Sequence, residues 1–236
     1  MKKALVAALL IIAAVPLLLA MAELPPHGSP DNVTYTHVSA YYLEHGVEEA
    51  GAENIVTDVI LNYRGFDTNG EVTVIFTALA AVLAVLLLGR TSSESADKPA
   101  YPVSAVVRFI VRLLAPFIAM FAIYVILNGH LTPGGGFQGG TILGALAIAL
   151  TLVLGEDEAR RLLPEGPKPW LQAAAPLTFV CIGIAGLADV GSYLGFPTAE
   201  GLEWVRTIWL MLIEIGIGVG GAAIIATIFW TMEAER

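Results

Sequence analysis

The chain has 236 residues, of which 56% are hydrophobic and 14% charged, and its mean hydropathy is +0.75. A soluble protein of this length rarely reaches such values, so the composition argues against a soluble fold with a large buried core. The formal net charge is −9, and we expect no nucleic-acid partner.

The first apolar run, Ala4–Ala22, follows Lys2 and Lys3 and ends in Ala-Met-Ala. This pattern is also typical of a secretory signal peptide with a small-residue cleavage site. The run is longer than a usual signal core, so we interpret it as an uncleaved helix that is kinked near Pro16.

Five further runs are long and apolar enough to cross a bilayer. At about 1.5 Å of rise per residue, even the shortest of them just crosses a hydrocarbon core of about 30 Å. They are Val72–Gly89, Ala105–Leu127, Phe137–Gly155, Leu171–Tyr193 and Val205–Thr231. The sequence therefore predicts an all-α integral membrane protein with about six transmembrane helices and a multi-pass location in the cell membrane.

The basic residues predict which side of the membrane each loop occupies. With six helices and a cytoplasmic N-terminus, all of them except Arg64 and Arg206 fall on or near the inner side, as the positive-inside rule requires. Both termini are then cytoplasmic. The same arrangement puts the acidic segment Glu23–Glu71 outside, where it either aids solubility or concentrates cations.

Part of this outer segment has helical periodicity. From Val47 to Leu61 the apolar residues recur at loosely helical spacing, which predicts an amphipathic helix at the outer interface or on a partner. The motif from Arg64 to Glu71 then opens the second membrane helix.

This motif has two interpretations. In the first, Thr68 or Asn69 caps the helix, Glu71 complements its dipole, and Arg64 and Asp67 form an outer charged pair. In the second, the cluster lies at the mouth of an ion path, with Glu71 as a relay candidate.

The chain divides into two predicted modules. Residues 1–90 form a two-helix module with a long outer segment, and residues 103–236 form a four-helix module of two hairpins. Between them, residues 91–102 are polar and rich in serine, which predicts a flexible linker.

A glycine-rich turn joins two of the predicted helices. It runs from Asn128 to Gly140 and is too short to form a domain, so the helices must form a tight antiparallel hairpin. Glycine at this density lets backbones pack closely, or unwinds a helix end where carbonyls meet an ion. The structural residues of the turn are Pro133, Gly134, Gly135, Gly136, Gly139 and Gly140.

Glu214 is the strongest candidate for moving a proton or a cation. It lies within a run of Ile, Leu and Gly, where facing lipid would cost a central carboxylate about 2.5–3.5 kcal/mol. It is either a relay or a neutral residue that hydrogen-bonds between helices for assembly. Asp189, near the outer end of its helix, and His130, in the glycine-rich turn, are weaker relay candidates.

No cofactor or metal site is expected. The histidines are scattered without ligand spacing, and the single cysteine, Cys181, excludes an intramolecular disulfide and any cysteine-based metal site. The sequence also contains no motif for binding nucleotides and no nucleophile elbow, so we expect no catalytic residue.

Three motifs resemble a known family of membrane proteins. HLTPGGGFQGG (His130–Gly140) and EIGIGVGG (Glu214–Gly221) resemble the MrpB (MnhB) component of the Mrp-type multisubunit Na+/H+ antiporters and its equivalent in archaeal membrane-bound hydrogenase and sulfane reductase complexes. The stretch Glu53–Glu71 resembles the C-terminal part of the large antiporter subunit, which is a separate two-helix protein, MbhE-like, in those archaeal complexes. The resemblance covers nearly all of the chain except residues 1–50.

The resemblance implies a role in coupling electron transfer or proton flux to Na+ movement inside a large membrane assembly. Implied partners are other Mrp-type membrane subunits, Na+, H+ and lipid, together with hydrogenase or flavin and iron–sulfur subunits. The fusion of the two units favours a respiratory complex over a dedicated antiporter. The alternative is a non-conducting subunit that serves structure and assembly.

Overall fold

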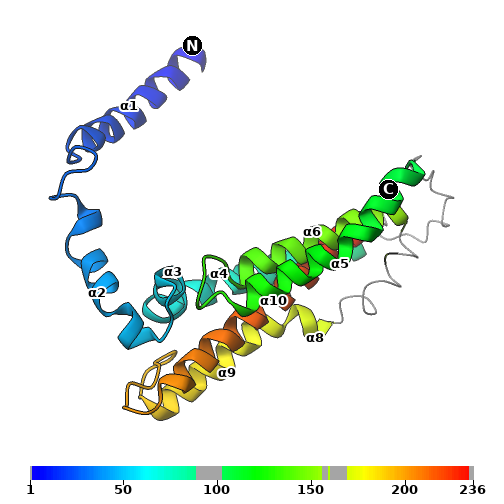
Figure 1. Ribbon diagram of the computed structural model, residues 1–236. Helices are drawn as coiled ribbons and strands as arrows, with labels where there is room; N and C mark the ends of the chain where they lie inside the picture. Colours follow the sequence, from blue (N-terminus) through cyan, green and yellow to red (C-terminus); the bar gives the residue numbers. More distant parts are fainter. Residues whose placement is uncertain (1, 89–102, 156–158, 160–168, 234–236) are drawn as a thin grey trace. The chain divides into compact units, whose positions relative to one another are not determined.

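The computed structural model describes residues 2–88, 103–155, 159 and 169–233, and all the regular elements in these ranges are helical (Figure 1). The chain divides into two compact units, residues 1–45 and residues 46–236. The predicted linker at 91–102 lies outside the described residues, and the predicted module boundaries stay a prediction.

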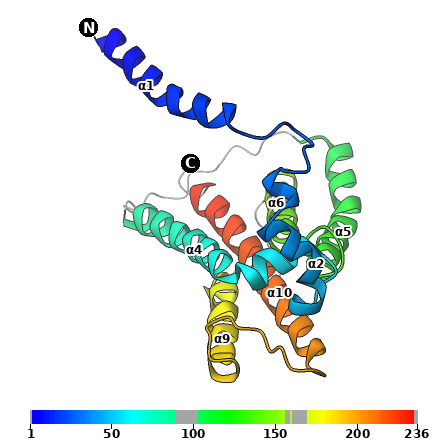
Figure 2. The same ribbon diagram turned by 90° about the vertical axis from the view of Figure 1, so that its left-hand side faces the viewer.

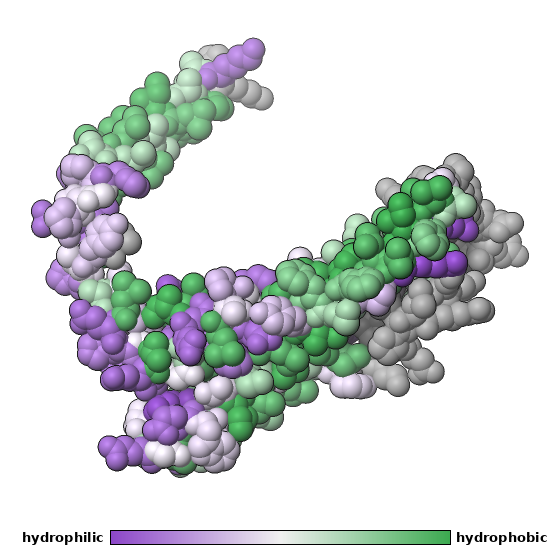
Figure 3. Space-filling view, in the orientation of Figure 1, coloured by the Kyte–Doolittle hydropathy of each residue, from purple (hydrophilic) through white to green (hydrophobic). Residues whose placement is uncertain are grey.

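The first unit holds one long apolar helix. Helix α1 spans Lys2–Ala22, the short helix η1 spans Val33–Tyr35, and most of helix α2 (Val38–Ala50) belongs to the same unit. No residue of α1 between Lys3 and Ala22 is buried inside the protein. Its surface is apolar along most of its length, which suits a helix surrounded by lipid (Figure 3).

The second unit begins in the last turn of α2 and contains the other helices. The short α3 (Ile55–Thr57) continues directly into η2 (Asp58–Tyr63), a π-helix. The remaining helices are α4 (Gly65–Leu88), α5 (Ala105–Leu127), α6 (Gly136–Leu154), α8 (Pro169–Gln172), α9 (Ala174–Asp189) and α10 (Glu203–Glu233). Figure 2 shows α4, α5, α6, α9 and α10 from a second direction.

The all-α membrane architecture is confirmed, with one difference in length. In the described ranges, 5 helices are long and apolar enough to span a bilayer: α1, α4, α5, α6 and α10. The predicted span Leu171–Tyr193 instead holds α9, which has 16 residues and is therefore about 24 Å long. It ends early because Gly191, with φ of +80°, turns the chain into the left-handed region just after the helix.

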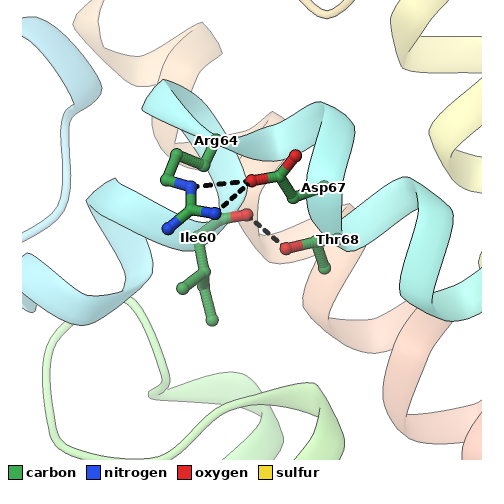
Figure 4. A network of polar contacts seen from close by, with 4 residues as sticks. All are labelled: Ile60, Arg64, Asp67 and Thr68. Carbon is green, nitrogen blue, oxygen red and sulfur yellow. Dashed lines mark hydrogen bonds and ion pairs between the residues drawn. The ribbon is translucent and has the colours of Figure 1, made fainter. Parts of the chain in front are cut away.

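Helix α4 begins earlier than predicted, at Gly65 rather than Val72. The capping role expected of Thr68 or Asn69 is therefore wrong, because both residues lie inside the helix. The Thr68 hydroxyl instead donates to the carbonyl of Ile60 at 2.5 Å and satisfies a carbonyl of the π-helix (Figure 4).

Close contact between backbones holds α6 against α10. Helix α6 packs on both α5 and α10. A Cβ atom added to Gly140 would lie 2.7 Å from the carbonyl oxygen of Gly218 on α10, so no side chain fits between the two helices there. Small residues commonly allow such an approach between membrane helices.

We expect Gly140→Ala to weaken the packing of α6 on α10, at a cost of about 1–3 kcal/mol, because the new methyl group meets backbone that cannot rotate away. Gly221→Ala is the matched control, since a Cβ at Gly221 meets nothing within 4 Å. Thermal unfolding of the detergent-solubilised protein should show a lower midpoint for Gly140→Ala alone. Equal midpoints would contradict the packing role of Gly140.

Candidate functional site

Glu214 lies near the middle of α10 and is 2% exposed, between the buried residues Ile213 and Gly216. Its Oε1 atom is 3.4 Å from the hydroxyl oxygen of Thr57. Its Oε2 atom has no hydrogen-bond partner among the residues that the structure describes. The carboxyl group is therefore enclosed by other parts of the protein.

The glycine-rich turn forms a wall of this site. A side chain on Gly129 would overlap the Glu214 carboxyl group, and a Cβ on Gly135 would lie 3.4 Å from Oε1. Gly135 also has a φ of +132°, which L-residues with side chains rarely adopt. Gly136 packs on the backbone carbonyl of Glu214 itself. Two features that the sequence predicted separately, the turn and the buried carboxylate, thus form one site.

Asn54 clamps the segment before η2 to this turn. Its side-chain Nδ2 atom donates to the carbonyls of Gly129 at 2.7 Å and Thr132 at 2.9 Å. The backbone N–H groups of Glu53 and Asn54 both donate to the carbonyl of His130, at 2.9 and 3.1 Å. These bonds satisfy carbonyls of an irregular loop that has few partners of its own.

Sequence reasoning missed Asn54 and Thr57 because it expected one amphipathic helix over residues 47–61. The structure breaks that helix at Gly51, whose φ is +85°, and restarts it at Asn54, whose side chain accepts from the Val56 N–H. The buried face includes polar residues: Thr57 is 2% exposed, whereas Val56 is 53% exposed. One signal in the sequence could have revealed them: Asn54 and Thr57 are polar residues that recur at helical spacing within an apolar stretch.

Asp58 is a second buried carboxylic acid, and it lies outside the membrane-spanning helices. It is 0% exposed, and its Oδ1 atom accepts from the Ala52 N–H at 3.2 Å. Burial raises the pKa of Asp58 from 3.8 to about 7, although the hydrogen bond from Ala52 acts in the opposite direction. Its position in a π-helix is notable, because such segments are frequent at functional sites.

His130 lines an acidic cavity of about 450 Å³. The cavity is lined by Glu48, Glu53 and Glu203 as well as by Arg206. Burial lowers the pKa of His130, while the nearby Glu53 carboxylate partly offsets this effect.

Arg206, predicted to lie on the outer side, is only 6% exposed, and one of its guanidinium N–H groups donates to the carbonyl of Pro197 at 3.2 Å. The glycine-rich turn lies between this cavity and Glu214. Gly129 faces the carboxyl group of Glu214, whereas the next residue, His130, lines the cavity.

The other predicted residues lie elsewhere. Glu71 on α4 and Asp189 at the end of α9 are exposed, so the structure does not group them with the buried Glu214. Arg64 and Asp67 form a pair at 2.6 Å, with side chains 63% and 52% exposed (Figure 4). Exposed pairs of this kind contribute about 0–1 kcal/mol. In the described part of the chain, no group of three His, Cys, Asp or Glu residues could hold a metal ion.

Two family models match the chain. Residues 106–232 match a domain related to the MnhB subunit of Na+/H+ antiporters, and residues 12–102 match MbhE, one of the subunits of MBH. The first stretch contains the glycine-rich turn and Glu214, and the second contains Asn54, Thr57 and Asp58.

Solved structures and a relative extend these matches. A chain of the membrane-bound sulfane sulfur reductase, an archaeal respiratory membrane complex, is 34% identical, with a TM-score of 0.71 and 98% of both chains covered. A chain of the Mrp complex from Dietzia is 25% identical, with a TM-score of 0.66, and the similarity covers 95% of the present chain and 26% of the Dietzia one.

The probable K+/H+ antiporter A/B subunit of Rhizobium meliloti is 28% identical over 187 residues, which cover 68% of the present chain and 18% of the Rhizobium protein. The chain thus spans about a fifth of the length of that relative.

We expect Asn54→Ala to destabilise the site by about 2–4 kcal/mol, because it removes two hydrogen bonds to the turn and leaves buried carbonyls with fewer donors. Asn69→Ala is the control, since Asn69 makes one long contact of 3.4 Å with the Tyr193 hydroxyl. Limited proteolysis and thermal unfolding of the solubilised protein measure the effect. A change no larger than that of the control would contradict the clamp.

The buried Asp58 should make stability depend on pH. Between the unfolded pKa of 3.8 and the folded pKa of about 7, the folded state binds more protons, so stability falls as pH rises through this window. Above it the whole penalty is present, on the order of 4 kcal/mol at most. We expect Asp58→Asn to flatten this dependence in thermal unfolding between about pH 5 and pH 8, whereas Asp67→Asn, at an exposed position, should not.

Proposed function

This chain belongs to the family of MnhB-related subunits of Na+/H+ antiporters, and we propose that it is a membrane subunit of a cation/proton antiporter module in a respiratory complex. The resemblance to MrpB is confirmed by the match over residues 106–232, and the resemblance of the first module by the match over residues 12–102. The family and the apolar helices make it a multi-pass membrane protein.

A complex of the sulfane-reductase type is the better setting than a dedicated antiporter. The similarity to the sulfane reductase chain covers 98% of both chains, which supports a shared arrangement along their whole lengths. The Mrp chain from Dietzia is much longer, and the present chain covers 26% of it. We therefore propose other Mrp-type subunits and a redox module of the same complex as partners.

Within this module we propose that Glu214 binds the proton or cation that is exchanged. The observation that carries this proposal is a carboxyl group, 2% exposed, in the middle of a membrane helix with one oxygen lacking a partner among the described residues. A side chain placed only for packing would be apolar, because a buried carboxyl group costs several kcal/mol unless it is fully hydrogen-bonded. The glutamates that line the cavity beside His130 would attract cations to the side of the turn that faces away from Glu214.

A structural role is the second candidate, and specific contacts favour it. The clamp of Asn54 on the turn and the backbone contact of Gly140 with Gly218 both hold separate segments together. In this alternative Glu214 is neutral and serves as a further link between segments, through Thr57. The two roles predict different results when the carboxyl group is replaced by an amide.

We expect Glu214→Gln to leave the complex assembled and to abolish cation-dependent proton movement, because an amide keeps the shape of the side chain and one acceptor oxygen but cannot exchange a proton. Inverted membrane vesicles that contain the assembled complex report this as the loss of ΔpH collapse on addition of Na+ or K+. Glu71→Gln, at an exposed carboxyl group of the same chain, is the control. Full activity of an assembled Glu214→Gln complex would leave only the structural role.

A further inference from the structure

We propose that Thr57 is a positioning residue for Glu214, and that the ion or proton site is therefore completed by both matched stretches of the chain. Thr57 lies in the stretch that matches MbhE, whereas Glu214 lies in the MnhB-related domain. This inference rests on the proposed function of Glu214 and adds the residue that sets the geometry and charge of its carboxyl group.

The position of Thr57 is fixed on several sides. It is the last residue of α3 and is 2% exposed. Its hydroxyl oxygen lies 2.8 Å from the carbonyl oxygen of Gly129, 3.4 Å from Oε1 of Glu214 and 3.1 Å from Nδ2 of Asn54. Within the described residues, Thr57 is the side chain that hydrogen-bonds to Glu214. The hydroxyl group is thus held between the glycine-rich turn and the carboxyl group.

Counting hydrogens shows that this hydroxyl group has two alternative arrangements. A threonine hydroxyl carries one hydrogen, so it cannot donate to Gly129 and to Glu214 at once. The shorter distance, to Gly129, is that of a normal O–H···O bond, while the distance to Glu214 is long. These distances favour the arrangement in which the hydroxyl group donates to the turn and can accept from a protonated Glu214.

When Glu214 is ionised, the hydroxyl group is expected to turn and donate to Oε1, because a bond to a charged acceptor is about twice as strong as a neutral one. The carbonyl of Gly129 keeps a hydrogen-bond donor when the hydroxyl group turns away. Asn54 has two hydrogens on Nδ2, and its shortest contacts are with the carbonyls of Gly129 and Thr132. The clamp thus frees the Thr57 hydroxyl group to follow the charge of Glu214.

The walls of the site leave few other ways to stabilise this charge. Two residues of the turn face Oε1, Gly129 and Gly135, and neither has a side chain that could donate a hydrogen bond. The donor that the turn does provide is the backbone N–H of His130. Thr57 thereby links a segment next to the π-helix with the membrane helix that carries the carboxyl group. Removing the Thr57 hydroxyl group should change how strongly Glu214 binds its proton or cation, without changing the shape of the site.

The test compares two substitutions in the assembled complex. Thr57→Val replaces the hydroxyl group with a methyl group of similar size, and we expect it to lower Na+- or K+-dependent ΔpH collapse in vesicles about tenfold or more, since it removes a hydrogen bond to a charged group. Thr57→Ser keeps the hydroxyl group and should restore most of the activity. Thr178→Val is the matched control, because the Thr178 hydroxyl group donates within its own helix while its side chain packs on α10 at Gly216.

A further measurement separates positioning from packing alone. In infrared difference spectra, the carboxyl band that disappears in Glu214→Gln should be shifted in Thr57→Val and unshifted in Thr178→Val. This spectrum can also be measured if Thr57→Val assembles in low yield, because the measurement does not depend on transport activity.

The outcomes distinguish this inference from the proposed function. If Glu214→Gln is fully active, the proposed function of Glu214 is wrong, and the role of Thr57 that rests on it is wrong as well. If Glu214→Gln is inactive while Thr57→Val is active and leaves the carboxyl band in place, the proposed function stands and the role of Thr57 is wrong. An inactive Thr57→Val that Thr57→Ser does not rescue would also overturn it.

Discussion

The burial of one carboxyl group in an apolar helix is the constraint on which the rest of the second unit depends. Glu214 cannot face lipid cheaply, so other parts of the chain must enclose it. Helix α10 alone cannot do so, because its neighbouring positions are Ile and Gly. The glycine-rich turn supplies the wall and Thr57 supplies the hydroxyl group, so two segments distant from α10 in the sequence contact Glu214.

The turn that forms this wall creates a second requirement. An irregular loop at the end of membrane helices exposes carbonyl groups, and in a site with little water each needs a donor. Asn54 and its neighbours meet this need for the carbonyls of Gly129, His130 and Thr132. The glycines therefore explain why Asn54 is needed. They let the turn approach Glu214 closely, but the backbone carbonyls of this irregular turn then need hydrogen-bond donors from another segment.

The sequence predicted the fold, and it singled out Glu214 and the glycine-rich turn separately. Length and hydropathy are enough to locate membrane helices, because spanning depends on a local apolar run, and Ala105–Leu127 was predicted to the residue. Glu214 was found because a charge in such a run is unusual. Asn54 and Thr57 were missed because their role depends on Gly51, which breaks the helix and turns the polar face inward, and on a turn more than 70 residues away in the sequence. Contacts between distant segments leave no local periodicity to read.

The arrangement also bears on whether Glu214 is a link or a relay. A structural hydrogen bond between helices is best made by groups whose partners are all satisfied, since an unsatisfied buried oxygen costs about 1–3 kcal/mol. Here Oε2 of Glu214 lacks a partner in the described ranges and the contact to Thr57 is long, at 3.4 Å. The segments are already joined by the shorter bonds of Asn54 and by backbone contact between α6 and α10. A buried carboxyl group with one long hydrogen bond and one oxygen without a partner in these ranges supports the proposal that Glu214 exchanges protons or cations.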